Sequence, residues 1–356
     1  MPASRHARAL TTSRTQSSRP LNPGRLLAIL TLLLPLACAA GLATGAVGLG
    51  LGDVLAAIVG QSEGRTATIV MDIRLPRVLL AAIMGANLAI CGAAMQGLFR
   101  NPLADPSLIG VTAGASLGAA IAIVAGATQL QGIGVLSVVS VGAFTGGVLA
   151  VLFVYRLATT DNGTSVATML LAGIAITALA GACSSLLEFF ADNTLLRRIS
   201  LWKLGGLDGA GGAELWLGFG VTAVLCAAIP RYAKALNALL LGESEARHLG
   251  IDVARTKLAL VLLVAIGVGT SVALVGTIAF VGLVVPHIVR LIIGPAHQGL
   301  LPCSAMAGAL LLVVADAVSR TALAPTEIPV GIVTAILGVP FFISLLRQRH
   351  HYGMQP

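Results

Sequence analysis

Long stretches without charge are the feature that most constrains this chain. Residues 106–155 form 50 consecutive positions without Lys, Arg, Asp or Glu. A helix needs roughly 20 apolar residues to cross a bilayer, and backbone in lipid must be hydrogen-bonded in helices or closed barrels. Only 10% of the 356 residues are charged, against about 25% in soluble domains. The sequence therefore predicts an all-α polytopic membrane protein and disfavours soluble enzymes.

Counting the apolar stretches gives ten transmembrane helices. Residues 106–155 are too long for one helix, and the Gly and Gln residues between 126 and 134 indicate a turn between two. Residues 258–289 are also expected to hold two helices, joined near residues 276–282. The remaining six are expected within residues 26–52, 78–99, 162–187, 215–230, 291–315 and 321–346.

The basic residues orient this topology. Ten crossings place both termini on one side, and cytoplasmic termini put fifteen of the 22 basic residues inside, as the positive-inside rule requires. The seven predicted outside are Arg65, Arg74, Arg77, Arg197, Arg198, Lys203 and Arg320. We interpret the net charge of +8 as orientation, with no nucleic-acid partner. We expect a disordered basic cytoplasmic arm (residues 1–25), a transmembrane domain (26–348) and a cytoplasmic tail (349–356).

Little in the sequence points to catalysis. Residues 114–118 match the nucleophile-elbow pattern around Ser116, but that motif needs a strand-to-helix turn and here lies in an apolar stretch. Close packing of small residues explains it better. No phosphate-binding loop is present, so any ATP and its Mg must be bound by another chain. The five cysteines stand singly, without metal-ligand spacing. We expect no catalytic residue, no metal and no permanently bound cofactor.

Residues 231–257 form a long cytoplasmic segment with a short helix-forming core. Its central residues mix acids, a base and a histidine between two glycines, and such a helix at the membrane face suits the groove of a soluble partner. A plain solvated connector is the alternative. The residues concerned are Gly242, Glu243, Ser244, Glu245, Ala246, Arg247, His248, Leu249 and Gly250.

Residues 101–106 form a stiff turn between the second and third predicted helices. Pro102 and Pro106 prevent a continuous helix there. A rigid loop that points Leu103 inward closes a pore by hydrophobic contact, with Asn101 beside it. A simple helix-stopping corner is the alternative.

Arg74, Arg77 and Arg320 lie on the side where the positive-inside rule disfavours them. Guanidinium groups pair carboxylates bidentately, so these residues indicate an acidic docking partner. Arginines that reach out to lipid phosphates are the alternative.

Polar residues within the apolar stretches are costly unless they face the bundle interior or a cavity. We expect Glu188 and Asp316 near helix ends, where water reaches them, and do not assign them as proton carriers. For His287, which follows Pro286, a structural hydrogen bond is favoured over a haem ligand.

Several long motifs in order resemble one family, the permease subunits of bacterial FecCD-type (type II) ABC importers for cobalamin, ferric siderophores and haem. The resemblance spans about residues 26–348. The motifs are the Arg74-Leu-Pro-Arg77 segment and residues 92–106, 241–250, 276–290 and 327–334.

This resemblance implies a homodimer of ten-helix subunits in the bacterial inner membrane, two cytoplasmic ATPase subunits and a periplasmic binding protein. By the same resemblance, Arg74, Arg77 and Arg320 match arginines that meet acids of the binding protein. Asn101 and Leu103 match an inner gate, and residues 242–250 match the helices that couple to the ATPase. The implied mechanism is alternating access without chemistry on the cargo.

Residues 99–110 and 170–181 are most similar to the haem-importing branch. Haem is therefore the expected cargo, delivered by a periplasmic haem-binding protein, with ferric siderophore or cobalamin as the alternatives. An ion-coupled secondary transporter relying on Glu188 or Asp316 is the rival of another class. A membrane-embedded enzyme would need clustered His or carboxylate residues, and none is found.

Overall fold

The computed structural model describes residues 21–126, 138–161 and 163–352. Ten apolar helices follow the ten predicted crossings in order. Seven are long enough to span a membrane: α1 (Pro23–Ala43), α3 to α4 (Arg65–Leu98), α6 (Val138–Ala158), α7 (Val166–Phe190), α9 to α10 (Gly212–Leu241), α12 (Val253–Val275) and α14 (His297–Thr321). Two are shorter, α5 (Val111–Val124) and α13 (Val281–Ile293), and α15 (Val330–Tyr352) has a short apolar part, Val330–Leu345. The all-α membrane class is confirmed, and ten full crossings stay a prediction.

Short elements connect these helices. A two-stranded antiparallel ribbon pairs Thr159 with Thr164. The two composite spans divide into α3 (Arg65–Ala67), the π-helix η1 (Thr68–Arg74) and α4 (Leu75–Leu98), and into α9 (Gly212–Ala228), η3 (Ile229–Tyr232) and α10 (Ala233–Leu241). The others are α2 (Leu51–Ile58), η2 (Pro106–Ile109), β1 (Thr159–Thr160), β2 (Gly163–Thr164), α8 (Asn193–Lys203) and α11 (Glu243–His248).

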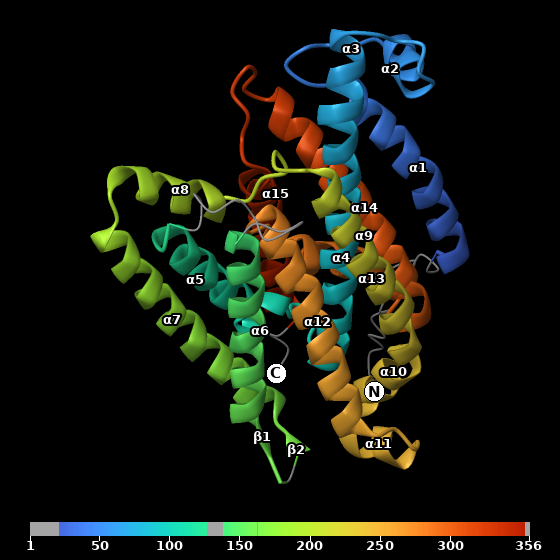
Figure 1. The fold of residues 1–356 in the computed structure, drawn as a ribbon. Coiled ribbons are helices and arrows are strands. Elements are labelled where there is room, and N and C mark those ends of the chain that lie inside the picture. The colour runs from blue at the N-terminus through green and yellow to red at the C-terminus, as the bar shows by residue number, and fades with distance from the viewer. Residues whose placement is uncertain (1–20, 127–137, 162, 353–356) are drawn as a thin grey trace, which may run out of the picture.

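Helix α4 is the centre of the bundle, with α9, α12, α13 and α14 packed around it (Figure 1). In the most apolar window of the span that contains α4, 78% of the residues are buried, against 17% in α7. A Cβ on Gly85 would overlap the carbonyl of Gly308 in α14, and one on Gly92 would overlap that of Gly282 in α13. Backbones approach this closely only where side chains are absent. The buried amide of Asn87 adds a hydrogen bond of 3.1 Å to the Gly267 carbonyl.

Two details of the predicted topology are confirmed. Residues 276–280 separate α12 from α13, within the predicted joint. Ser116 lies inside α5, where Gly114 packs against Gly146 of α6. The match to a nucleophile motif is therefore a helix-packing feature.

Three predicted boundaries shift. Helix α1 begins at Pro23, because the Asn22 side chain accepts a hydrogen bond from the Gly24 amide and caps the helix. The helix before α4 begins at Arg65, so Arg74 and Arg77 lie within a helical span. Helix α15 continues to Tyr352, into the expected tail, because no Gly or Pro occurs between Pro340 and Gly353. Residues 1–20 of the expected arm and 127–137 of the expected turn lie outside the described residues.

Two ends of the bundle matter for function. The "arginine end" holds Arg74, Arg77, Asp316, Arg320 and Glu327. The "α11 end" holds α11 and the loop after α4, at the bottom of Figure 1.

Candidate functional site

A buried carboxylate organises the arginine end. Asp316, in the last turns of α14, is fully buried. One of its oxygens accepts a hydrogen bond from Nε of Arg77 at 2.7 Å, and the other accepts one from Nε of Arg320 at 3.0 Å. A buried charge is tolerated only when it is paired in this way. Asp316 therefore ties α4 to α14 through its salt bridge with Arg77, and its second salt bridge, with Arg320, lies within α14.

Two arginines hold the C-terminus of α1. Arg74 donates to the carbonyls of Leu42 and Ala43, at 2.7 and 3.2 Å, and to that of Val47. Arg320 donates to the carbonyls of Gly41 and Thr44, both at 2.9 Å. The last carbonyls of a helix lack intrahelical partners, and positive charge there complements the helix dipole. The guanidinium groups thus act as caps for α1.

These contacts bear on two expectations. Arg74, Arg77 and Arg320 are only 5%, 7% and 4% exposed, and their role in docking a partner stays a prediction. Asp316 is not reached by water, because Arg77 and Arg320 enclose it. The sequence placed these residues at the correct ends of their helices but gave no sign that α1 and α14 supply their partners.

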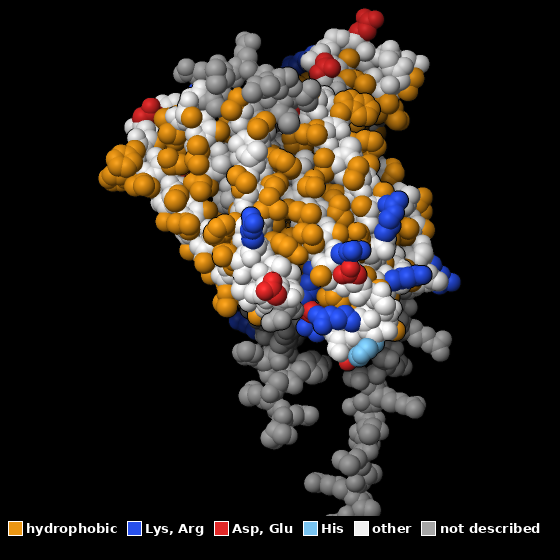
Figure 2. Space-filling view, turned by 60° about the horizontal axis from the view of Figure 1, so that its bottom comes forward, with side chains coloured by type: hydrophobic (Ala, Val, Ile, Leu, Met, Phe, Trp, Pro, Cys, Tyr) orange, Lys and Arg blue, Asp and Glu red, His pale blue; other side chains and the backbone are white. Residues whose placement is uncertain are grey.

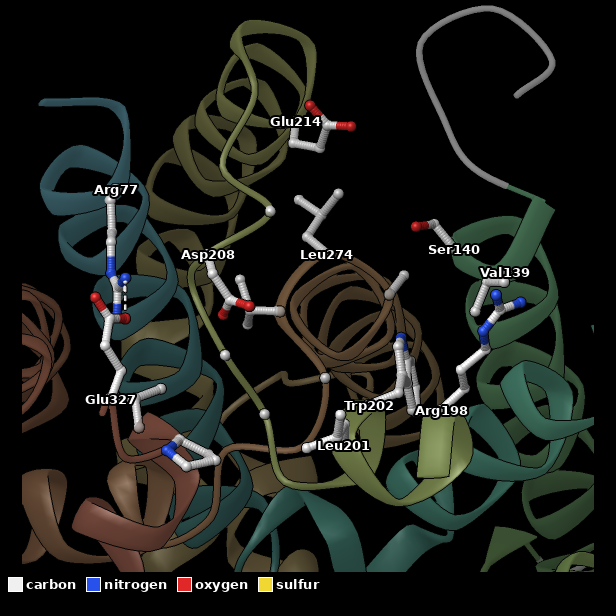
Figure 3. Close-up of a pocket in the computed structure, with 18 of the residues that line it drawn as sticks. Arg77, Val139, Ser140, Arg198, Leu201, Trp202, Asp208, Glu214, Leu274 and Glu327 are labelled. Atoms are coloured by element: carbon white, nitrogen blue, oxygen red, sulfur yellow. Dashed lines mark hydrogen bonds and ion pairs between the residues drawn. The ribbon is translucent and has the colours of Figure 1, made fainter. Parts of the chain in front are cut away.

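Glu327 adds a carboxylate that sequence reasoning missed. It lies between α14 and α15, and its Oε2 accepts a hydrogen bond from Nη1 of Arg77 at 2.6 Å. The sequence did contain a signal for Glu327, since it begins the motif at residues 327–334 and follows Arg320 closely in the chain. Figure 3 shows Arg77 and Glu327 paired on one side of a pocket.

That pocket is a cavity of about 680 Å³ within one chain. Its lining combines apolar side chains, such as Trp202 and Leu274, with the carboxylates of Asp208 and Glu214 (Figure 3). Arg198 and Ser140 line the side opposite Arg77. The lining comes from α4 with Arg77, the end of α5, the start of α6, the end of α8, the 204–211 loop, the start of α9, the end of α12 and the segment before α15.

Glu188, the second acid within the apolar stretches, is also paired. It forms a salt bridge with Lys203 at the end of α8, and both side chains are about a third exposed or less. Water access was expected for Glu188, and its side chain is 27% exposed. His287 packs edge-on against Phe341, with ring centroids 6.0 Å apart. Within the described ranges, no group of three or more His, Cys, Asp or Glu side chains is placed to hold a metal ion.

The loop after α4 is rigid by local hydrogen bonds. Asn101 is exposed, and its Oδ1 accepts a hydrogen bond from the Leu103 amide at 3.0 Å. Asp105 accepts one from the Ser107 amide at 2.8 Å and caps η2. Burial raises the pKa of the Asp105 carboxyl, and its bonds with Ser107 act in the opposite direction. Leu103 is partly buried, so the geometry is that of a stiff turn, and its role as a gate stays a prediction.

The segment from Gly242 to Gly250 forms the predicted short helix. Helix α11 spans Glu243–His248, and the glycines at either side have φ of 132° and 82°, which side chains rarely adopt. Ala246 is buried and fixes one face. The other residues point outward: Ser244, Glu245, Arg247, His248, Leu249 and Gly250 are exposed. Leu249 is 64% exposed, which is unusual for a leucine in a polar turn.

Lys257 anchors this segment. Sequence alone identifies it only as a charge at the end of a loop and does not indicate its burial. It lies in the first turns of α12 with only 2% of its side chain exposed. Its Nζ donates to Oε1 of Glu243 at 2.7 Å and to the Thr164 carbonyl at 2.6 Å. Glu243 therefore faces inward, toward α12 and β2, and is not available to a partner in the way that Glu245 is.

Basic side chains gather at the α11 end. Figure 2 shows Lys and Arg side chains gathered around the α11 end, beneath a broad band of hydrophobic side chains. The hydrophobic band is the surface that lipid covers in a membrane protein, and the basic rim is typical of a cytoplasmic face.

Comparisons with known proteins agree with this architecture. The model of the FecCD transport family matches residues 31–348. The hemin transport system permease protein HmuU of Yersinia pestis is 45% identical over 280 residues, which cover 78% of this chain and 83% of that protein. The cobalamin import system permease protein BtuC of Halobacterium salinarum is 44% identical over 281 residues, which cover 79% and 74%.

A solved structure shares the fold. The inward-facing conformation of a metal-chelate type ABC transporter aligns with a TM-score of 0.77 at 31% identity, covering 92% of this chain and 99% of that one. The family match covers most of the chain, and the helices it covers are the ones described above. The chain therefore belongs to the FecCD transport family, as the membrane-spanning permease subunit of an ABC importer whose ATPase is a separate subunit.

Proposed function

We propose that this permease imports haem. The observation that carries the proposal is the 45% identity with the hemin permease of Yersinia pestis over most of both chains. Cobalamin is the second candidate, because a cobalamin permease is 44% identical over a similar length. A ferric siderophore is the third, as a cargo of the same family. Haem would be a transported substrate and not a resident cofactor.

The proposed complex contains two copies of this chain, two cytoplasmic ATPase subunits that bind ATP and Mg, and a periplasmic haem-binding protein. The α11 end is assigned to the cytoplasm with both termini, since the basic side chains gather there. The arginine end then faces the periplasm and receives the binding protein.

The proposed mechanism is alternating access driven from the cytoplasm. Helix α11 presents Glu245, Arg247 and Leu249 to the ATPase, while the salt bridge between Glu243 and the buried Lys257 transmits its movement to α12. The loop with Asn101 and Leu103 is the proposed inner gate. The arginine end fixes the docking face through Arg74, Arg77 and Arg320.

The cargo is tested by stimulation of ATP hydrolysis. The full complex in lipid nanodiscs would be mixed with its binding protein loaded with hemin, with cobalamin or with a ferric siderophore. Hemin is expected to give the largest increase over the unloaded binding protein. A larger increase with cobalamin would replace haem by the second candidate.

An ion-coupled transporter is the rival mechanism. The two acids that it would use, Glu188 and Asp316, are both in salt bridges, which disfavours a freely titrating carrier. Uptake into vesicles that contain the permease without its ATPase would establish the rival instead.

A further inference from the structure

Arg77 has two carboxylate partners that differ in their access to water. Asp316 is fully buried and holds Nε of Arg77, while Glu327 holds Nη1 with a side chain that is 45% exposed. Breaking a buried pair leaves an uncompensated charge, whereas a half-exposed carboxylate regains water when it leaves. Of the two partners, Glu327 is therefore the one that another carboxylate can replace.

The position of Glu327 gives such an exchange a structural consequence. Glu327 comes three residues before α15, and it lines the cavity with the following Ile328, Pro329 and Val330. Gly331, in the first turn of α15, packs against the carbonyls of Leu204 and Thr277, which are next in sequence to the lining residues Gly205 and Gly276. The salt bridge to Arg77 thus ties the start of α15 to α4.

The charges around Arg77 favour an incoming anion. Among the described residues, Asp316 and Glu327 are the acids in salt bridges with these arginines, so Arg74, Arg77 and Arg320 keep a surplus of one positive charge over them. A guanidinium group can pair a carboxylate through two parallel N–H···O bonds, so a carboxylate that replaces Glu327 can be held by Arg77.

We propose that Glu327 is an internal competitor, occupying on Arg77 the position that a carboxylate of the docking protein takes. The proposal rests on the proposed function, which places docking at the arginine end. When the incoming carboxylate displaces Glu327, the segment before α15 loses its link to α4 and the rim of the cavity is released. Docking is thereby coupled to the outer mouth, and the affinity for the partner is lowered by the fraction of molecules in which Glu327 is paired.

The test is the affinity of the permease–ATPase complex in nanodiscs for the importer's own binding protein, used unloaded so that the cargo does not matter. Glu327→Gln removes the competing charge and should bind roughly threefold to tenfold more tightly than wild type, since the competent fraction rises. Glu327→Asp keeps the competing charge and should bind within about twofold of wild type. Glu214→Gln is the matched control, because it removes one charge from the same cavity and Glu214 has no salt bridge within the described residues.

The competing role requires Arg77. In an Arg77→Gln background, used at a temperature where that complex is still folded and assembled, the gain from Glu327→Gln should disappear, which is the signature of two coupled residues. Equal affinity of wild type and Glu327→Gln, or an equal gain in Glu214→Gln, would overturn the competitor while leaving the importer function intact. Absence of binding to the wild-type complex would instead remove the proposed docking itself.

Discussion

The arginine end and the α11 end contain similar charged residues, used in opposite ways. At the arginine end the guanidinium groups point inward. Each of Arg74, Arg77 and Arg320 donates hydrogen bonds to a carboxylate or to the carbonyls at a helix terminus. At the α11 end one buried lysine anchors the segment through Glu243, and the side chains of Glu245, Arg247 and His248 are exposed.

The difference shows that the exposure of a charged side chain distinguishes residues that stabilise the bundle from residues that are available to a partner. Charges enclosed at the arginine end hold α1, α4 and α14 together, so their removal should first affect stability. Charges on α11 touch little of this chain, so their removal should first affect a partner. The following predictions test that division.

Asp316→Ala is expected to have the largest effect. It leaves Arg77 and Arg320 buried without their shared carboxylate, and removal of one partner of a buried pair costs about 3–5 kcal/mol. The free energy of unfolding, measured by denaturant titration in detergent micelles, should fall accordingly. Asp72→Ala, an exposed acid in η1, is the control and should change it little. Similar losses for both variants would contradict the structural role of the cluster.

Lys257→Met comes next and should separate coupling from folding. The methionine fills the same space without the charge, so Glu243 and the Thr164 carbonyl lose their donor. We expect a loss of stability of about 1–2 kcal/mol and a clear drop in cargo moved per ATP hydrolysed. Lys234→Met, at an exposed position in α10, should preserve both quantities. An unchanged transport ratio in Lys257→Met would show that the anchor is not needed for coupling.

Leu249→Ala should weaken the contact with the ATPase subunit. A large apolar side chain at an interface contributes about 1–2 kcal/mol when truncated, and Leu249 contacts mostly solvent in this chain. The affinity of purified ATPase for the permease in nanodiscs should decrease, with unfolding unchanged. Leu32→Ala, on the exposed face of α1, is the control for losing a surface leucine. Weakening of equal size in the control would remove Leu249 from the interface.

Arg247→Ala is expected to have the smallest effect on stability. Its contact with Glu243 is an exposed i,i+4 pair at 3.8 Å, which is worth less than about 0.5 kcal/mol. The same denaturant titration used for Asp316→Ala should show nearly wild-type behaviour. A loss comparable with that of Asp316→Ala would abolish the distinction between the two ends.

Much of the fold was predictable from charge-free length, because lipid enforces helices wherever charges are absent. The joint near residues 276–282 and the short helix at 243–248 were predicted correctly from local sequence. Glycines interrupt the apolar stretch at the joint, and glycines flank the polar residues of the short helix. The partners of charged residues were not predictable in this way. Asp316 meets Arg77 across 239 positions of sequence, and no local pattern indicates such a pair.

The exposure of the candidate site was also beyond the sequence. Arg74 and Arg77 look like surface residues next to a predicted helix start, but the helix begins earlier, at Arg65, and brings them inside. Lys257 looks like a loop charge and is buried because β2 supplies the Thr164 carbonyl. Both errors arise from tertiary contacts that a single sequence does not reveal.

The glycine contacts of Gly85 and Gly92 have a mechanical consequence. No side chain separates the backbone of α4 from those of α13 and α14 at these glycines. The three helices therefore cannot slide past one another without steric collision, and they behave as one rigid unit. We therefore expect the conformational changes of a transport cycle to occur mainly in the loosely packed helices around this unit, chiefly α7 and α15. Fluorescent labels attached to α7 and α15 should change their signal during the transport cycle, while labels on α4, α13 and α14 should not.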